Sequence, residues 1–375
     1  MTSPPEYLSG EVPNLFSNLR YDVTGTTTTA RRSTANAVLP SAALLCGTSL
    51  GCGLLFLPSA VGDAGYLPGS IATVVAWAYM TMTALLTSEL LINRIGETGR
   101  PARGVGLLEL YDAHLGKTAG RLAGLGFLSL VDTTDLNPGA ALDAFPLLFM
   151  GWTYHGVVPR VVHDLEGDRD KITRAIGLGS TTALIIYLTW NAMIIGNASL
   201  GVGDVGGGFT DAGTLSVAVV SELAVLTSLV GVVLGFVNEF NDAIGKAFPP
   251  SSPADFDGKK WNIALLTLSP PAVVSIALGY YHSTGGDVDN YEIVDYTGIF
   301  GSSVLFMILP ALMAWNNRYG EEDPPRSLTV RPMVPLGKIP LGSLYKAAGT
   351  LLVEQGLDKL GLFEFVREHL FNAGA

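Results

Sequence analysis

Two stretches of this chain interrupt apolar residues with glycine and proline in a way that could create a ligand site inside a membrane. The first runs from Cys46 to Pro58 and reads Cys-Gly-Thr-Ser-Leu-Gly-Cys-Gly-Leu-Leu-Phe-Leu-Pro. Glycine and proline weaken a helix by about 1 and about 3 kcal/mol. Unpaired backbone at membrane depth is tolerated only where it is buried in protein or lines a watery cavity. A glycine break within a spanning segment is therefore a candidate ligand site.

The same glycines also have a purely structural explanation. Gly47 and Gly51 form a small-xxx-small pair, the spacing by which two membrane helices pack closely. Taken alone, they favour packing over binding. A second interrupted segment, from Phe145 to Pro159, reads Phe-Pro-Leu-Leu-Phe-Met-Gly-Trp-Thr-Tyr-His-Gly-Val-Val-Pro. Two such segments are typical of inverted-repeat transporters, in which half-helix ends meet near the midplane, so the pair favours a binding site.

The composition indicates a membrane protein. Charged residues make up 15% and hydrophobic residues 48% of the chain, against about 25% charged residues in an ordinary soluble domain. The lipid bilayer is therefore an expected partner. The net charge of -11 argues against nucleic acid, because phosphate-binding surfaces need clustered Lys and Arg. The sequence has no nucleophile-base constellation, metal-ligand spacing or phosphate loop, so we expect no enzyme, no metal and no cofactor.

The elements that must position the two stretches are membrane spans of about 20 mostly apolar residues. Clear candidates are 38–61, 67–92, 140–160, 175–197, 214–240, 261–281 and 292–315, with a weaker one at 115–135. The 22 Lys and Arg residues fall before the first span, in alternate connections and after the last. This alternation follows the positive-inside rule only if the weak segment crosses. We predict eight spans with both termini inside and no signal peptide.

Three regions follow from this pattern. We predict a disordered inner tail over 1–36, a transmembrane domain over 37–316, and an inner C-terminal region over 317–375. Within the last region, apolar residues recur at helical spacing from Leu344 to Phe371, but charged residues interrupt them. A charge costs about 2.5 to 3.5 kcal/mol at the centre of a membrane helix. We therefore predict an amphipathic helix lying on the inner surface.

The ordered succession of motifs resembles the hydroxy and aromatic amino acid permeases, the tyrosine- and tryptophan-specific transport proteins. Residues 47–58 resemble the first helix of this family, and Tyr-His-Gly-Val-Val-Pro at 154–159 resembles the sixth. Motifs resembling the seventh to tenth helices follow in order at 188–191, 227–235, 268–271, 298–301 and 309–312. The resemblance covers about residues 40 to 318. It implies an all-α secondary transporter of two inverted five-helix repeats, with helices 1 and 6 broken, coupled to protons.

The chain departs from the family in one region. Family members have about eleven spans, whereas this chain has one weak segment between 67–92 and the helix containing His155. Residues 115–131 resemble the start of the third helix, and residues from Ala140 onward resemble the sixth. The resemblance thus implies that helices 4 and 5 and part of 3 are missing. A truncated or mis-spliced permease that no longer transports and acts as a binding or partner subunit is one explanation, and a real reduced protein is the other.

The resemblance also implies substrate contacts for tyrosine or tryptophan in a plasma, inner or plastid envelope membrane. Amide N–H groups at the first break would bind the substrate carboxylate, those of Leu50, Gly51, Cys52 and Gly53. Carbonyl groups at the second break would bind its ammonium group, those of Gly151, Trp152, Thr153 and Tyr154. The aromatic rings there would pack against the substrate ring, or make ordinary helix contacts instead. Thr153 stands where the family usually has glycine.

Ionisable residues at membrane depth are candidates for function. His155 is the leading proton carrier, because histidine titrates near neutral pH; a neutral histidine bonded to a neighbouring carbonyl is the alternative. Glu222 is a second candidate for proton coupling, or lies near the outer mouth. We expect Glu89 to reach the inner interface by snorkelling. Asn191 could bond across helices.

Overall fold

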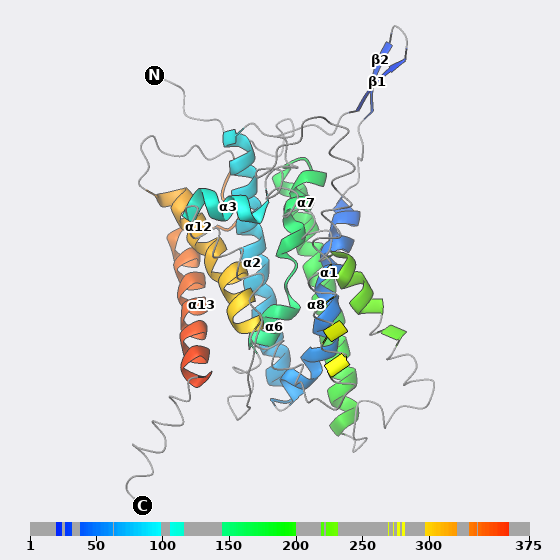
Figure 1. Cartoon of the computed structure of the whole chain (residues 1–375), viewed down its shortest axis with the longest axis vertical. Helices are drawn as coiled ribbons and strands as arrows, with labels where there is room; N and C mark the ends of the chain where they lie inside the picture. The colour runs from blue at the N-terminus through cyan, green and yellow to red at the C-terminus, as the bar shows by residue number, and fades with distance from the viewer. Residues whose placement is uncertain are drawn as a thin grey trace, which may run out of the picture.

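The computed structural model is a bundle of helices that run lengthwise beside one another (Figure 1). It describes residues 20–24, 27–31, 38–62, 64–98, 106–115, 145–199, 219–220, 223–231, 269, 273, 276–277, 280–281, 297–320, 330–335 and 337–359. This part is nearly all helical, as predicted. The predicted spans at 115–135, 214–240 and 261–281 lie wholly or mostly outside it, so the expected number of eight spans stays a prediction.

Three long helices form one side of the bundle: α1 (Val38–Gly62), α2 (Tyr66–Thr98) and α8 (Arg169–Ser199). α1 packs along α8 over most of its length, and α2 packs against α8 as well. Within the described residues, two segments are long and apolar enough to cross a membrane, Tyr66–Glu97 in α2 and Arg169–Ile195 in α8. These helices are the frame into which the second interrupted segment is placed.

The first glycine-rich stretch does not break its helix. α1 runs without interruption from Val38 to Gly62 and contains Pro58. The prediction of a broken helix 1 is therefore wrong for this structure. The physical reason is that backbone groups in an apolar interior must pair, and a continuous helix pairs them within the segment. Neighbouring side chains fill the space beside the glycines, as described below, and offset their low helix propensity.

The second stretch does interrupt its helix. α6 (Phe145–Gly151) ends at Gly151, and residues 152–154 are not helical. A single 3₁₀ turn, η2 (His155–Val157), then leads into α7 (Val158–Asp164). Pro159 lies in the first turn of α7, where a missing N–H group costs no helix bond. The predicted interruption at Gly151 is present.

The C-terminal half of the described chain consists of η3 (Thr297–Ile308), which is π-helical, α12 (Leu309–Tyr319) and α13 (Lys338–Lys359). α13 packs lengthwise against η3 and α12 and runs back along the bundle (Figure 1). The hydroxyl of Tyr79 on α2 donates a 2.5 Å hydrogen bond to the Leu344 carbonyl of α13. α13 is thus a member of the bundle.

The part of the predicted amphipathic helix that the structure describes packs against the bundle, and its location on the inner side stays a prediction. Leu341, Leu344 and Ala348 are buried against the bundle, while Ile339 and Val353 are exposed. The exposed side of α13 thus carries apolar residues beside charged ones. α13 is not among the described segments that are long and apolar enough to cross a membrane.

Two short elements lie outside the predicted spans. The strands β1 (Arg20–Thr24) and β2 (Thr27–Arg31) pair antiparallel, with Arg20 opposite Arg31. They fall within the segment predicted to be disordered. α3 (Leu107–Leu115) lies across the end of the bundle where α2 and α12 end (Figure 1). Its 9 residues are too few for a span, which is why the search for spans missed it.

A buried ion pair joins α2 to α12 near this end of the bundle. Glu89 and Arg318 have side chains only 1% and 3% exposed, and two nitrogen–oxygen distances of 2.6 and 2.7 Å make the pair bidentate. The N–H group of Met333 donates to the same carboxylate at 2.7 Å. The prediction that Glu89 snorkels to the interface is wrong, because a buried partner satisfies its charge. Because Met333 shortly precedes α13, the Glu89 carboxylate also holds the backbone that leads into this helix.

We predict that Glu89→Ala destabilises the protein strongly. The substitution leaves the Arg318 guanidinium buried without its counter-ion, and breaking a buried pair from one side costs about 3–5 kcal/mol. Asp164→Ala is the control, because the Arg160–Asp164 pair has side chains 47% and 33% exposed and an exposed pair contributes about 0–1 kcal/mol. Thermal unfolding of the detergent-solubilised variants measures both. Equal losses in the two variants would contradict the assigned role.

Candidate functional site

The helix break lies directly against the glycine-rich stretch of α1. A Cβ atom at Gly151 would lie 3.3 Å from the Cα atom of Gly53 and 2.9 Å from a terminal carbon of Leu57. Two residues predicted to belong to one site, about a hundred positions apart in sequence, are therefore neighbours in space. Glycine is needed at position 151, because a side chain there would push α6 away from the backbone of α1.

Tyr187 of α8 joins the two segments. Its side chain is fully buried, and its hydroxyl contacts the carbonyl oxygens of Ser49 in α1 and Gly151 at the end of α6, the latter at 3.0 Å. A Tyr hydroxyl has one proton, so the two carbonyls share it. The Gly151 carbonyl, which the helix break frees, thus receives a donor from another helix. Sequence reasoning missed Tyr187; the signal was a tyrosine within an apolar span, whose hydroxyl needs a partner.

The glycines of α1 are sites of close helix packing in this structure. A Cβ atom at Gly53 would overlap the ring of Tyr187, and one at Gly51 would overlap Ser228. The Ser228 hydroxyl donates to the Thr48 carbonyl at 2.9 Å. The packing explanation of the glycine spacing is therefore the one that the structure shows. The proposed contacts of this stretch with a substrate stay predictions.

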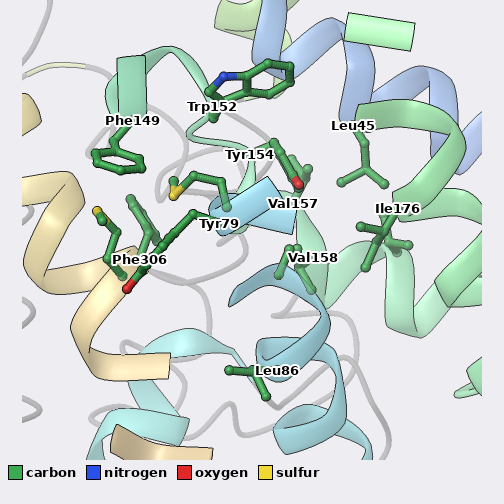
Figure 2. Packing of buried hydrophobic residues seen from close by; sticks show 14 of the residues in the cluster. Leu45, Tyr79, Leu86, Phe149, Trp152, Tyr154, Val157, Val158, Ile176 and Phe306 are labelled. Atoms are coloured by element: carbon green, nitrogen blue, oxygen red, sulfur yellow. The ribbon is translucent and has the colours of Figure 1, made fainter. Parts of the chain in front are cut away.

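Aromatic side chains surround the break. Trp152 meets the ring of Tyr187 edge-to-face, with centroids 4.9 Å apart. Tyr154 stacks on His155 at 5.3 Å, and His155 stacks on Phe306 of η3 at 5.0 Å. Figure 2 shows Trp152, Tyr154 and Phe306 within the packed core of the bundle. The rings of Trp152 and Tyr154 thus already have aromatic partners within the protein. This agrees with the alternative that they make ordinary helix contacts.

His155 is fully buried, and its Nε2 atom lies 3.0 Å from the Thr83 hydroxyl of α2. That hydroxyl also lies 3.0 Å from the Met80 carbonyl and 3.4 Å from the Tyr79 carbonyl. When the hydroxyl donates its one proton to a carbonyl, Nε2 is the protonated ring nitrogen and Nδ1 is an acceptor. Nδ1 has no hydrogen-bond partner within the described residues. The partner of His155 is a hydroxyl group rather than the carbonyl that the alternative expected.

The other predicted site residues divide into three groups. Leu50 is half-buried on α1, with its backbone inside the helix. Thr153 lies in the linker, and its hydroxyl donates to the Met150 carbonyl. The side chain of Cys52 and the whole of Glu222 lie outside the described residues. No cluster of His, Cys, Asp or Glu that could bind a metal occurs in the part of the chain that the structure describes.

Comparison with protein families assigns the chain. The model of the tryptophan/tyrosine permease family matches residues 34–133, 129–201 and 210–332. The chain belongs to this family. The first matched stretch ends, and the second begins, at residues 129–133, beside the junction where the sequence implied that family helices are missing.

Relatives of this tryptophan/tyrosine permease chain are bacterial transporters. A tryptophan-specific transport protein of Pseudomonas aeruginosa is 28% identical over 199 residues, 47% of this chain and 42% of that protein. A low affinity tryptophan permease of Escherichia coli O157:H7 is 28% identical, over 43% of this chain and 44% of that protein. A tyrosine permease of Enterobacter agglomerans is 29% identical, over 38% of each chain.

The chain spans less than half the length of these curated relatives. No solved structure matches it. The relatives are named as transport proteins and permeases, which confirms the predicted family and the prediction that the chain is no enzyme. Membership of a permease family also supports a membrane protein.

We predict that Gly51→Ala destabilises the bundle and that Ser228→Gly in the same chain restores much of the loss. The added methyl group overlaps the Cβ atom of Ser228, whereas the Ser228 Cα atom lies 3.4 Å away, at contact distance. Overpacking costs about 1–3 kcal/mol. Gly177→Ala is the control, because nothing lies within 4 Å of its added Cβ atom. Thermal unfolding measures the three proteins, and a Gly51→Ala variant as stable as Gly177→Ala would contradict the close packing.

Proposed function

We propose that this chain carries an aromatic or other neutral amino acid, tyrosine or tryptophan above all, across a membrane in symport with a proton. The observation that carries the proposal is the helix break after Gly151 and its contact with Gly53 of α1. A broken helix at membrane depth provides backbone groups for a substrate, and here the break lies against a continuous, glycine-rich helix. The substrate class is supported by the names of relatives that are specific for tryptophan or tyrosine.

The carbonyl of Gly151 is the group best placed to receive the ammonium of an amino acid. It projects from the end of α6, and in this structure the hydroxyl of Tyr187 donates to it. A charged donor forms a stronger hydrogen bond than a neutral one, so an ammonium group can replace the hydroxyl. We extend the proposed binding segment over Trp152, Thr153 and Tyr154, whose backbone forms the non-helical linker.

The contribution of α1 differs from that of a broken helix. Its N–H groups are bonded within a continuous helix, so those of Leu50, Gly51, Cys52 and Gly53 can reach a carboxylate only when α1 opens. We therefore propose that α1 unwinds at these residues during transport, which exposes their N–H groups to the substrate. The inverted repeat of five helices, with a shortened first repeat, belongs to the same proposal.

Proton coupling is assigned to His155. The Nδ1 atom of a neutral imidazole, which has no partner among the described residues, has a lone pair that can take up a proton, and His155 directly follows the non-helical linker that the proposal assigns to the substrate. Glu222 remains the second candidate for this role. Phe306, stacked on the ring at 5.0 Å, can stabilise an imidazolium through its π face.

We predict saturable uptake of labelled tyrosine or tryptophan by the purified chain in lipid vesicles, with a higher rate under an inward proton gradient. Gly151→Val should reduce uptake at least tenfold, because its side chain would force α6 away from Gly53 and Leu57. Gly177→Ala should transport at the wild-type rate. Binding without uptake would instead favour the reduced, non-transporting protein. Equal uptake with and without the gradient would remove the proton from the proposal.

We predict that His155→Gln abolishes the stimulation of uptake by the proton gradient. Glutamine can keep a hydrogen bond to Thr83 but cannot carry a proton at neutral pH. Stabilisation of the purified variant by added substrate should persist. His163→Gln is the matched control, because His163 pairs with Asp164 at the end of α7 and is remote from the break. Full stimulation in His155→Gln would transfer the role to Glu222.

A further inference from the structure

Asn191 of α8 has a buried side chain that no hydrogen bond explains. It is only 1% exposed, and neither its amide oxygen nor its amide nitrogen has a partner within the described residues. Buried amide groups in folded proteins are paired almost without exception, because desolvation is costly. The amide of Asn191 therefore has hydrogen-bonding capacity that a ligand or a water molecule can fill.

Asn191 shares a helix face with the proposed substrate site. It follows Tyr187 by four residues, so the two side chains point to the same side of α8, about 6 Å apart along the helix axis. Ile194 continues this buried face, while Met193 is exposed on another. The face is the one on which Tyr187 contacts Gly151 and Ser49.

A second orphaned group lies near the same tyrosine. The indole N–H group of Trp152 is buried without a hydrogen-bond partner in the described part of the chain, and its ring touches Tyr187. One unpaired group thus lies on the ring packed against Tyr187, and the other lies one helical turn further along the same face of α8. A ligand with its own polar groups would satisfy them, whereas an apolar one would not.

We propose that Asn191 contacts the polar tip of an aromatic substrate, the phenol O–H of tyrosine or the indole N–H of tryptophan. The inference rests on the proposed function. With the ammonium at the Gly151 carbonyl, a side chain lying along α8 reaches one helical turn further, to the level of Asn191. The amide oxygen accepts from either group, and the amide nitrogen can also donate to the phenol oxygen. Phenylalanine has no such group, so Asn191 would set the preference against it.

The test compares Asn191→Leu with Asn93→Leu. Asn93 is equally buried, at 1%, but its amide oxygen accepts a 3.1 Å hydrogen bond from the N–H group of Val330. Asn93→Leu should therefore lower the unfolding temperature, whereas Asn191→Leu, which removes two orphaned atoms, should leave it unchanged or raise it. Asn191→Ala serves in the same way if leucine disturbs packing. A fall like that of Asn93→Leu would show that Asn191 is structural and overturn the inference.

Uptake and ligand-induced stabilisation then measure specificity. In wild-type protein, kcat/KM for tyrosine should exceed that for phenylalanine, and Asn191→Leu should reduce this ratio at least tenfold, by raising KM for tyrosine alone. An unchanged ratio means that a water molecule satisfies Asn191, and overturns the inference while transport stands. Tyrosine stabilisation that depends on Asn191 without any uptake would support the contact and remove transport. The absence of both uptake and stabilisation would overturn the proposed transport and the proposed Asn191 contact.

Discussion

The hydroxyl of Tyr187 is the contact on which the arrangement of the site depends. It joins the Ser49 carbonyl of α1 to the Gly151 carbonyl at the end of α6, and Gly53 leaves room for its ring. The constraint behind it is that a carbonyl freed by a helix break cannot stay unpaired in an apolar interior. Tyr187 therefore holds α1, α6 and α8 together around the break.

The ion pair between Glu89 and Arg318 plays the corresponding part at the end of the bundle. It lies on α2 and α12, away from the break, and holds the backbone of Met333 as well. α2 also provides Thr83, which fixes the ring of His155. One helix thus contacts both the proposed proton carrier and the segment that leads into α13.

The sequence predicted correctly those features that depend only on neighbouring residues in the chain. The interruption at Gly151 was predictable, since proline and glycine weaken a helix wherever they occur. The same reasoning wrongly predicted a break in α1, because glycines interrupt an apolar segment there as well. A glycine break and a glycine contact differ only in what lies opposite, and Ser228 and Tyr187 come from distant parts of the chain. The packing of α13 against η3 could not be predicted from the local sequence either, because it depends on residues far apart in the chain.

The sequence by itself determined the family, the helical class and the residues at the break, because these follow from composition, spacing and an ordered set of motifs. The tertiary structure alone decided that Gly151 lies against Gly53 and that Tyr187 donates to the Gly151 carbonyl. It also decided that Asn191 is buried without a hydrogen-bond partner among the described residues. Periodicity says which face of a helix is buried, but the partner of a buried polar group depends on contacts between residues far apart in the chain.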